Sequence, residues 1–220
     1  MKNLIIRTIT GAVFVAAIIA SAILSPIAFA LLFLAMALPG MFEFQRLTRK
    51  QNKLGRALPG LLVSLLVYSI MALYALSYLE AIYLWMIIPL VIILLLYHLF
   101  YGSQRAISMI ASDTAGLLFV VFPMALLNLY LNPFHTPEYH TPWLVLGTLV
   151  ILWTHDTFAY LTGSIFGKHP LSRSISPGKS WEGSIGGLVF GVVAAYILSI
   201  YSSELELWHW LVIAFMVSFF

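Results

Sequence analysis

The residues best suited to chemistry lie between His155 and Gly187, where an acid inside an apolar stretch is followed by a polar loop. The acid is Asp156, and the loop carries Lys168, Arg173 and Lys179. A carboxylate can bind Mg²⁺ together with waters and phosphate oxygens, while lysine and arginine side chains bind the phosphates themselves. We therefore expect this segment to bind a metal-bound triphosphate, with Asp156 as the Mg²⁺ ligand.

Hydroxyl and backbone N–H groups beside these cations offer further hydrogen bonds to an anion. Ser176 and Ser180 lie in the loop, and the Ser180–Gly183 amides stand at a predicted helix start, which attracts negative charge. Glu182, at the same helix start, is expected to bind a metal-bound water or to fix Lys179. The Gly-Lys-Ser run ending at Ser180 is not a Walker A site, because that motif needs a glycine at position 173.

Helical spacing predicts that a pair of helices flanks this loop. Asp156 shares one helical face with Tyr160 and with the glycines at 163 and 167, which let another backbone or a phosphate approach. Glycines at 183, 187 and 191 predict a stripe that packs against a neighbouring helix. His155 points about 100° away from Asp156 on a helix, so we interpret it as a packed histidine rather than a catalytic base.

These residues belong to a chain with the composition of a membrane protein. Hydrophobic residues make up 62% of its 220 residues and charged residues only 9%, whereas soluble domains carry roughly a quarter charged residues. The sequence predicts an all-α, polytopic transmembrane helix bundle, in one domain over residues 1–220, with a partial eighth span from Leu207. Seven full spans are expected at 5–24, 27–46, 58–78, 81–101, 106–131, 143–166 and 182–201.

The distribution of charge predicts the orientation of these spans. All 11 Lys and Arg residues fall on one side, and the opposite side has only acids, at Glu80, Glu138, Glu204 and Glu206. Because cytoplasmic loops are rich in Lys and Arg, we place the N-terminus and the active-site loop of about 163–183 in the cytoplasm. The same rule accounts for the net charge of +3, so nucleic acid is not an expected partner.

Four further acids lie in the cytoplasmic half of the predicted spans or at their ends, at Glu43, Asp113, Asp156 and Glu182. A charged side chain at the bilayer centre costs at least ~2.5–3.5 kcal/mol, so such acids usually face water or a partner. We interpret the four as a polar pocket open to the cytoplasm. Two alternatives are that Glu43 pairs with Arg46 at i+3 and that Asp113 is a packed structural acid.

The motifs around the loop resemble those of the phosphatidate cytidylyltransferases, also called CDP-diacylglycerol synthases. The matching residues are Asp156-Thr157, Ala159-Tyr160, Gly163, Phe166-Gly167-Lys168, the run from Ile175 to Gly183, Gly186-Gly187, Arg7 with Gly11, and Glu43 with Leu47. The resemblance covers essentially the whole chain. It implies a nucleotidyltransferase of phospholipid biosynthesis in the bacterial inner membrane, which uses Mg²⁺ and converts phosphatidate and CTP to CDP-diacylglycerol and pyrophosphate.

In that reaction Asp156, Lys179 and Glu182 are assigned to catalysis, with Asp156 as the metal ligand. Substrate binding is assigned to Lys168, Arg173, Ser176 and Ser180. The family's late signature block, whose acids are expected to bind the principal metals, should follow the eighth span, whereas the sequence ends at Phe220 inside that span. We therefore expect the active enzyme to continue beyond Phe220. A further divalent or monovalent cation and a homodimer are left open.

Three alternatives come from other functional classes. A CTP-dependent polyprenol or phytol kinase would share the membrane and the nucleotide but would make a lipid phosphate instead of a CDP-lipid. A transporter would use Asp113 and Asp156 as a proton relay, although the internal repeats common in transporters are not visible in this sequence. An inactive fragment is the third alternative.

The predicted orientation can be tested by labelling introduced cysteines. Asn52→Cys and Ser172→Cys should react with membrane-impermeant thiol reagents only from the cytoplasmic side, and Glu138→Cys only from the outside. The native chain has no cysteine, so each variant reports a single position. Reversed labelling would overturn the cytoplasmic placement of the loop.

Overall fold

The computed structural model describes residues 2–49, 54–101, 106–132, 141–172, 176–202 and 205–219. Apart from one short hairpin, the regular elements in these ranges are helices, as the continuous apolar runs predict. The contacts divide the chain into two compact units, Met1–Pro142 and Trp143–Phe220, and each unit is described by itself. The single domain over residues 1–220 stays a prediction.

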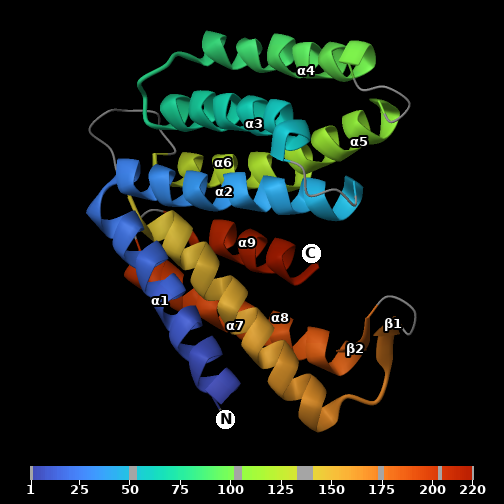
Figure 1. Ribbon diagram of the computed structural model, residues 1–220. Helices are drawn as coiled ribbons and strands as arrows, with labels where there is room; N and C mark the ends of the chain where they lie inside the picture. The colour runs from blue at the N-terminus through green and yellow to red at the C-terminus, as the bar shows by residue number, and fades with distance from the viewer. Residues whose placement is uncertain are drawn as a thin grey trace. The chain divides into compact units, whose positions relative to one another are not determined.

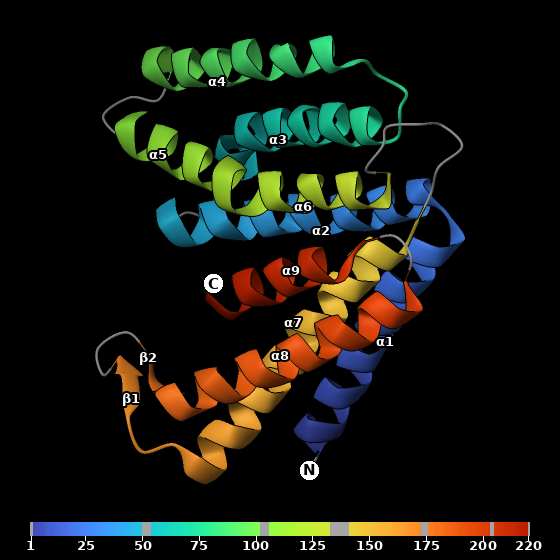
Figure 2. The same cartoon turned by 180° about the vertical axis from the view of Figure 1, so that it is seen from behind.

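The first unit is a set of packed helices in which α3 lies between α2 and α4, and α5 contacts both α2 and α4 (Figures 1 and 2). Its elements are α1 (Lys2–Leu24), α2 (Pro26–Arg49), α3 (Leu54–Ala75), η1 (Ala81–Met86), α4 (Ile87–Tyr101), α5 (Ala106–Gly116), η3 (Leu117–Val121), α6 (Phe122–Leu126) and η4 (Leu127–Leu131).

Proline residues act on these helices in two ways. Pro26 opens α2, where a missing N–H has no cost, and the hydroxyl of Ser25 accepts a hydrogen bond from the Ile27 N–H at 3.2 Å. Inside the apolar helices, the helix type changes beside Pro89 and Pro123. The 3₁₀ helix η1 passes into α4 just before Pro89, and the π-helical turn η3 ends just before Pro123.

The second unit contains α7 (Trp143–Phe166), β1 (Pro170–Ser172), β2 (Ser176–Ser180), α8 (Trp181–Tyr201) and α9 (Leu207–Phe219). Helices α7 and α8 form the main pair, and α9 packs against both. The core beneath α9 consists of Ile151, Ala194, Ala195, Trp210 and Ala214. A side chain at Gly147 would collide with the Trp210 ring, so this glycine lets the indole pack directly on the α7 backbone.

The predicted glycine stripe of α8 is confirmed as a packing surface. A Cβ atom at Gly183 would lie 2.7 Å from the Ala159 carbonyl oxygen, and one at Gly187 would lie 2.7 Å from the His155 ring. Since real Cβ atoms do not approach so closely, the glycines are what allow the two helix backbones to come together. The interpretation of His155 as a packed histidine agrees with this contact.

Among the residues that the structure describes, six helical segments are long and apolar enough to cross a membrane, and they correspond to six of the seven predicted full spans. They are Pro26–Arg49, Gly55–Ala75, Ala81–Tyr101, Ala106–Leu131, Trp143–Phe166 and Trp181–Tyr201. The apolar part of α1, Ile9–Leu24, and the helix α9 are shorter. The polytopic helix bundle is thus confirmed, while the count of seven full spans stays a prediction.

The glycine packing makes a prediction for stability. Gly187→Ala should destabilise the α7–α8 pair, because overpacking typically costs about 1–3 kcal/mol. Gly11→Ala is a matched control in helix α1, since a Cβ there has no atom within 4 Å. Thermal unfolding in detergent should show a lower midpoint for the first variant only; equal midpoints would contradict the assigned role of the stripe.

Candidate functional site

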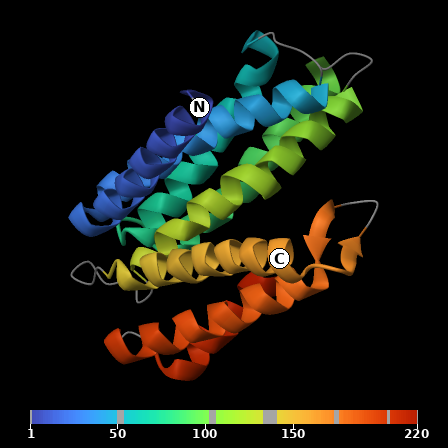
Figure 3. The same cartoon turned by 90° about the horizontal axis from the view of Figure 1, so that it is seen from below.

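The predicted active-site loop folds as a hairpin between α7 and α8, at one end of that helix pair (Figure 3). Strands β1 and β2 are antiparallel, with Pro170 opposite Ser180 and Ser172 opposite Ser176. The N–H of Trp181 donates a hydrogen bond to the His169 carbonyl oxygen at 3.0 Å, which closes the base of the hairpin. The described residues of the loop therefore form a hairpin whose base is tied to the start of α8.

Ser180 caps α8, because its side-chain oxygen accepts the Gly183 N–H at 3.1 Å. Its hydroxyl is also packed against α7, where a Cβ at Gly167 would lie 2.8 Å from Ser180 Oγ. Because Gly163 and Gly167 have no side chain, Ser180 and the Gly183 backbone at the start of α8 can pack against them. The amides of Trp181 and Gly183 are already engaged inside the chain and are not available to an anion.

Two of the predicted phosphate-binding cations belong to the two sides of the hairpin. Lys168 precedes β1 and Lys179 lies in β2 next to Ser180, and both side chains are exposed. Neither lysine forms an ion pair with any residue that the structure describes. Arg173 lies outside the described residues, and Ser176 opens β2 in a half-buried position. The hairpin therefore presents unpaired positive charge.

Glu182 binds His169 across the hairpin base. Its Oε1 lies 2.6 Å from His169 Nδ1, and its Oε2 accepts the His169 backbone N–H at 3.3 Å. His169 was not among the predicted site residues, and Glu182 was expected to fix Lys179 or to bind a metal-bound water. The observed partner is thirteen residues away, and no local motif indicates it.

Asp156 lies on α7, seven residues or about 10 Å along the helix axis from Gly163, where Ser180 packs. Its side chain is 70% exposed, and its Oδ1 is 3.4 Å from the Nδ1 of His155. An exposed carboxylate suits a hydrated Mg²⁺, which takes one or two carboxylates and completes its shell with water and phosphate oxygens. In the described part of the chain, no three acidic or histidine side chains gather as a metal site, so Asp156 would contribute a single ligand.

A second polar cluster, which the sequence analysis missed, is buried in the first unit. The carboxylate of Asp113 is fully buried and ion-paired with Arg49, and it also contacts His98 Nε2 at 2.6 Å and accepts a hydrogen bond from Gln45 Nε2 at 2.6 Å. Arg49 also donates to the carbonyl oxygens of Arg56 and Met109, at 2.9 and 3.3 Å. The members come from α2, α3, α4 and α5, so the cluster joins four helices.

This cluster corrects two expectations about the intramembrane acids. Asp113 is closed off and paired, so it does not line a pocket open to the cytoplasm. Glu43 is exposed, and it forms no ion pair with Arg46 or with another residue that the structure describes; the buried face of α2 carries Met41 and Gln45. A signal in the sequence was the spacing of four between Gln45 and Arg49, which places both on one helical face.

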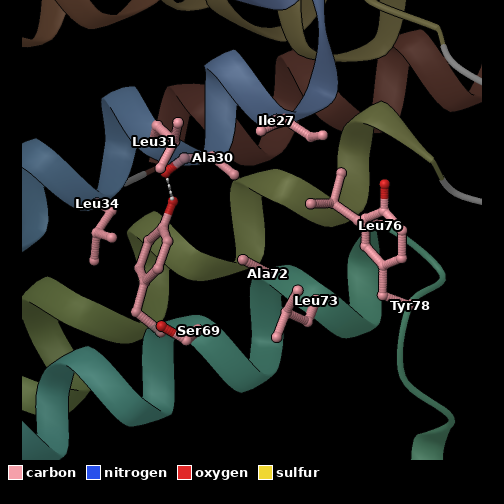
Figure 4. A pocket seen from close by; sticks show the side chains of 10 residues that line it. Ile27, Ala30, Leu31, Leu34, Ser69, Ala72, Leu73, Leu76 and Tyr78 are labelled. Carbon is pink, nitrogen blue, oxygen red and sulfur yellow. Dashed lines mark hydrogen bonds between the residues drawn. The ribbon is translucent and has the colours of Figure 1, made fainter.

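The first unit also has a groove of about 450 Å³ between α2 and α3 (Figure 4). Its polar contact is the Tyr68 hydroxyl, which donates to the Ala30 carbonyl oxygen at 2.8 Å and accepts from Asn128 at 3.1 Å. Because its lining carries no charged side chain, the groove is not a phosphate site. The lining residues are Ile27, Ala30, Leu31, Leu34, Tyr68, Ser69, Ala72, Leu73, Leu76 and Tyr78.

Comparison with known proteins identifies the family. The sequence pattern of the cytidylyltransferase family matches residues 5–220, which is nearly the entire chain. The chain belongs to the cytidylyltransferase family. This result confirms the resemblance seen around the loop, and together with the apolar helices it makes the chain an integral membrane protein.

Individual members of the cytidylyltransferase family are similar to shorter parts of the chain. A phosphatidate cytidylyltransferase of Haemophilus influenzae is 39% identical over 85 residues, which are 39% of this chain and 30% of that protein. One from Pseudomonas aeruginosa is 49% identical over 45 residues, or 20% and 17% of the two chains. Human phosphatidate cytidylyltransferase 1 is 53% identical over 51 residues, or 21% and 11%. The matched segments span less than a third of each relative's length.

From the buried cluster we predict how the stability of this cytidylyltransferase-family chain changes when one charge is removed. Asp113→Asn should destabilise the first unit by about 3–5 kcal/mol, because it leaves the Arg49 guanidinium buried without its counter-charge. Glu43→Gln removes the same charge from an exposed acid and should leave stability unchanged. Unfolding in a detergent titration measures both, and adding Arg49→Met to Asp113→Asn should recover part of the loss. Equal stability of the two single variants would contradict a structural role for the pair.

Proposed function

We propose that this chain acts as a phosphatidate cytidylyltransferase, which transfers the cytidylyl group of CTP to phosphatidate and releases pyrophosphate. The observation that carries the proposal is the family match over residues 5–220. The names of the bacterial and human relatives point to the same activity. The exposed lysines at the hairpin base supply the charge that two phosphate-bearing substrates need.

The reaction brings two anions together. An oxygen of the phosphatidate phosphate forms a bond to the α-phosphorus of CTP, and the bond from that phosphorus to the β-phosphate bridge oxygen breaks, so that pyrophosphate leaves. The protein must therefore neutralise both phosphates and align the attacking oxygen with the α-phosphorus. In our proposal Lys168, Lys179 and Arg173 hold phosphate oxygens, and the hydroxyls of Ser176 and Ser180 orient them.

Asp156 would hold Mg²⁺ through its exposed carboxylate. When bound, the ion supplies charge neutralisation on the phosphates and stabilises the leaving oxygen. Asp156 lies on the same unit as the hairpin, about 10 Å along α7 from the level of Ser180.

The location of the substrates fits the orientation that the charges indicate. With the N-terminus and the hairpin in the cytoplasm, CTP reaches the lysines from the aqueous side, and the lipid phosphate reaches them from the inner leaflet of the bacterial inner membrane. A homodimer stays a prediction.

The alternatives receive less support from the structure. The proposed proton relay of a transporter needs Asp113 to exchange protons with water, whereas Asp113 is fully buried and ion-paired with Arg49. A CTP-dependent lipid kinase differs from the proposed enzyme in its product, so it is resolved by chemical analysis of the lipid.

The proposed activity is tested with purified full-length protein, radiolabelled CTP, phosphatidate and Mg²⁺ in mixed micelles. CDP-diacylglycerol should form, whereas a lipid phosphate as the product would indicate the kinase. Asp156→Asn should lower turnover by orders of magnitude and raise the Mg²⁺ requirement, while Lys179→Ala should mainly raise the KM for CTP.

Two control variants keep this test specific. Glu206→Gln removes an acid at the start of α9, and Lys53→Ala removes a cation from another predicted cytoplasmic loop. Both should retain activity. Near-wild-type turnover of Asp156→Asn at limiting Mg²⁺ would show that Asp156 is not part of the site. Equal effects of Lys53→Ala and Lys179→Ala would show that the hairpin lysines only set the orientation of the chain in the membrane and do not bind CTP.

A further inference from the structure

The side chain of His169 is held firmly although it is 78% exposed. Both carboxylate oxygens of Glu182 contact this residue, one at the ring Nδ1 and one at the backbone N–H. The His169 carbonyl oxygen in turn accepts the Trp181 N–H at 3.0 Å. Three contacts to two consecutive residues of α8 therefore fix the histidine at the base of the hairpin.

The contact with Glu182 determines which ring nitrogen is free to act. An ionised carboxylate only accepts hydrogen bonds, so Nδ1 carries a proton and donates it to Glu182. The second ring nitrogen, Nε2, belongs to the exposed part of the residue. When both ring nitrogens carry a proton, Nε2–H is a donor as well and can reach a ligand from the exposed side of the ring.

The surroundings of His169 are those of an anion site. It directly follows Lys168, and its neighbour Pro170 pairs with Ser180, the residue after Lys179. The histidine thus belongs to the same hairpin as two exposed cations. A donor at Nε2 would add to the groups that this hairpin offers to a phosphate chain, while Glu182 is occupied in holding the ring.

We propose that His169 binds a phosphate of the nucleotide through Nε2–H, and that Glu182 is the residue that positions its imidazole. This inference rests on the proposed function, because it takes CTP and the released pyrophosphate as the anions. In this proposal Glu182 positions the His169 ring instead of binding a metal-bound water. The competing explanation is that the pair only closes the hairpin.

The two explanations differ in how nucleotide binding responds to the charge at position 169. His169→Ala should weaken binding of CTP and of inorganic pyrophosphate by about tenfold to a hundredfold, the usual range for losing a charge-assisted hydrogen bond. His169→Lys keeps a cation beside Glu182 and should recover most of this loss. Glu182→Gln keeps an acceptor for the ring and should weaken binding less than His169→Ala does.

Binding is measured directly, by equilibrium dialysis of radiolabelled CTP and pyrophosphate against the purified full-length protein with Mg²⁺. In parallel, the KM values for CTP and phosphatidate are compared, and we expect only the CTP value to rise. Ser164→Ala is the control, because it removes a neutral exposed side chain at the end of α7. Amide exchange at Trp181 reports whether the hairpin stays closed in each variant.

The outcomes separate this inference from the proposed function. Unchanged CTP and pyrophosphate binding in His169→Ala, or losses in His169→Lys as large as in His169→Ala, would overturn the role of His169. If the wild-type protein forms a lipid phosphate instead of CDP-lipid, the proposed function fails. A loss of nucleotide binding in His169→Ala that His169→Lys restores would still support the phosphate site.

Discussion

A carboxylate that is shielded from water needs hydrogen-bond donors inside the protein. The packing of the first unit depends on the donors that surround the buried Asp113 carboxylate. Its oxygens contact side chains from α2 and α4, and its main partner Arg49 reaches on to carbonyl oxygens of Arg56 and Met109. Even Gly60 is constrained, because a Cβ there would lie 2.6 Å from Asp113 Oδ1. Since buried charges are tolerated only with good geometry, the ends of these helices have little freedom to move relative to one another.

The second unit is assembled on a different physical basis. Helices α7 and α8 approach through glycines at 183 and 187, and their described core contains alanines, an isoleucine and a tryptophan but no ion pair. Lys168, Lys179 and Glu182 lie at the hairpin, at one end of the helix pair, whereas Asp156 lies on α7 and Glu206 beside α9. Packing without charges leaves Lys168 and Lys179 unpaired, which is the condition for them to bind an external anion.

Local periodicity explains which features could be predicted from the sequence. The apolar runs and the glycines at every fourth residue act within one helix, so the spans and the α8 stripe were visible. The partners of Asp113 were not, because Arg49 is 64 residues away and His98 is 15 residues away. The Glu43–Arg46 pair was wrong: the spacing allows it, but the two exposed side chains form no ion pair. The Glu182–His169 contact could not be predicted, because it depends on how the hairpin closes.

The sequence distance between Arg49 and Asp113 also has a consequence for biosynthesis. Arg49 leaves the ribosome 64 residues ahead of its partner, an interval of about 3–13 s at ordinary translation rates of ~5–20 residues per second. During that interval the guanidinium, at the last residue of α2, lacks the carboxylate with which it pairs in the folded protein, and a charged side chain is costly to bury without a partner. The ion pair that joins α2 to α5 can form only after α5 has been translated, so the packing of the first unit cannot be completed one helix at a time.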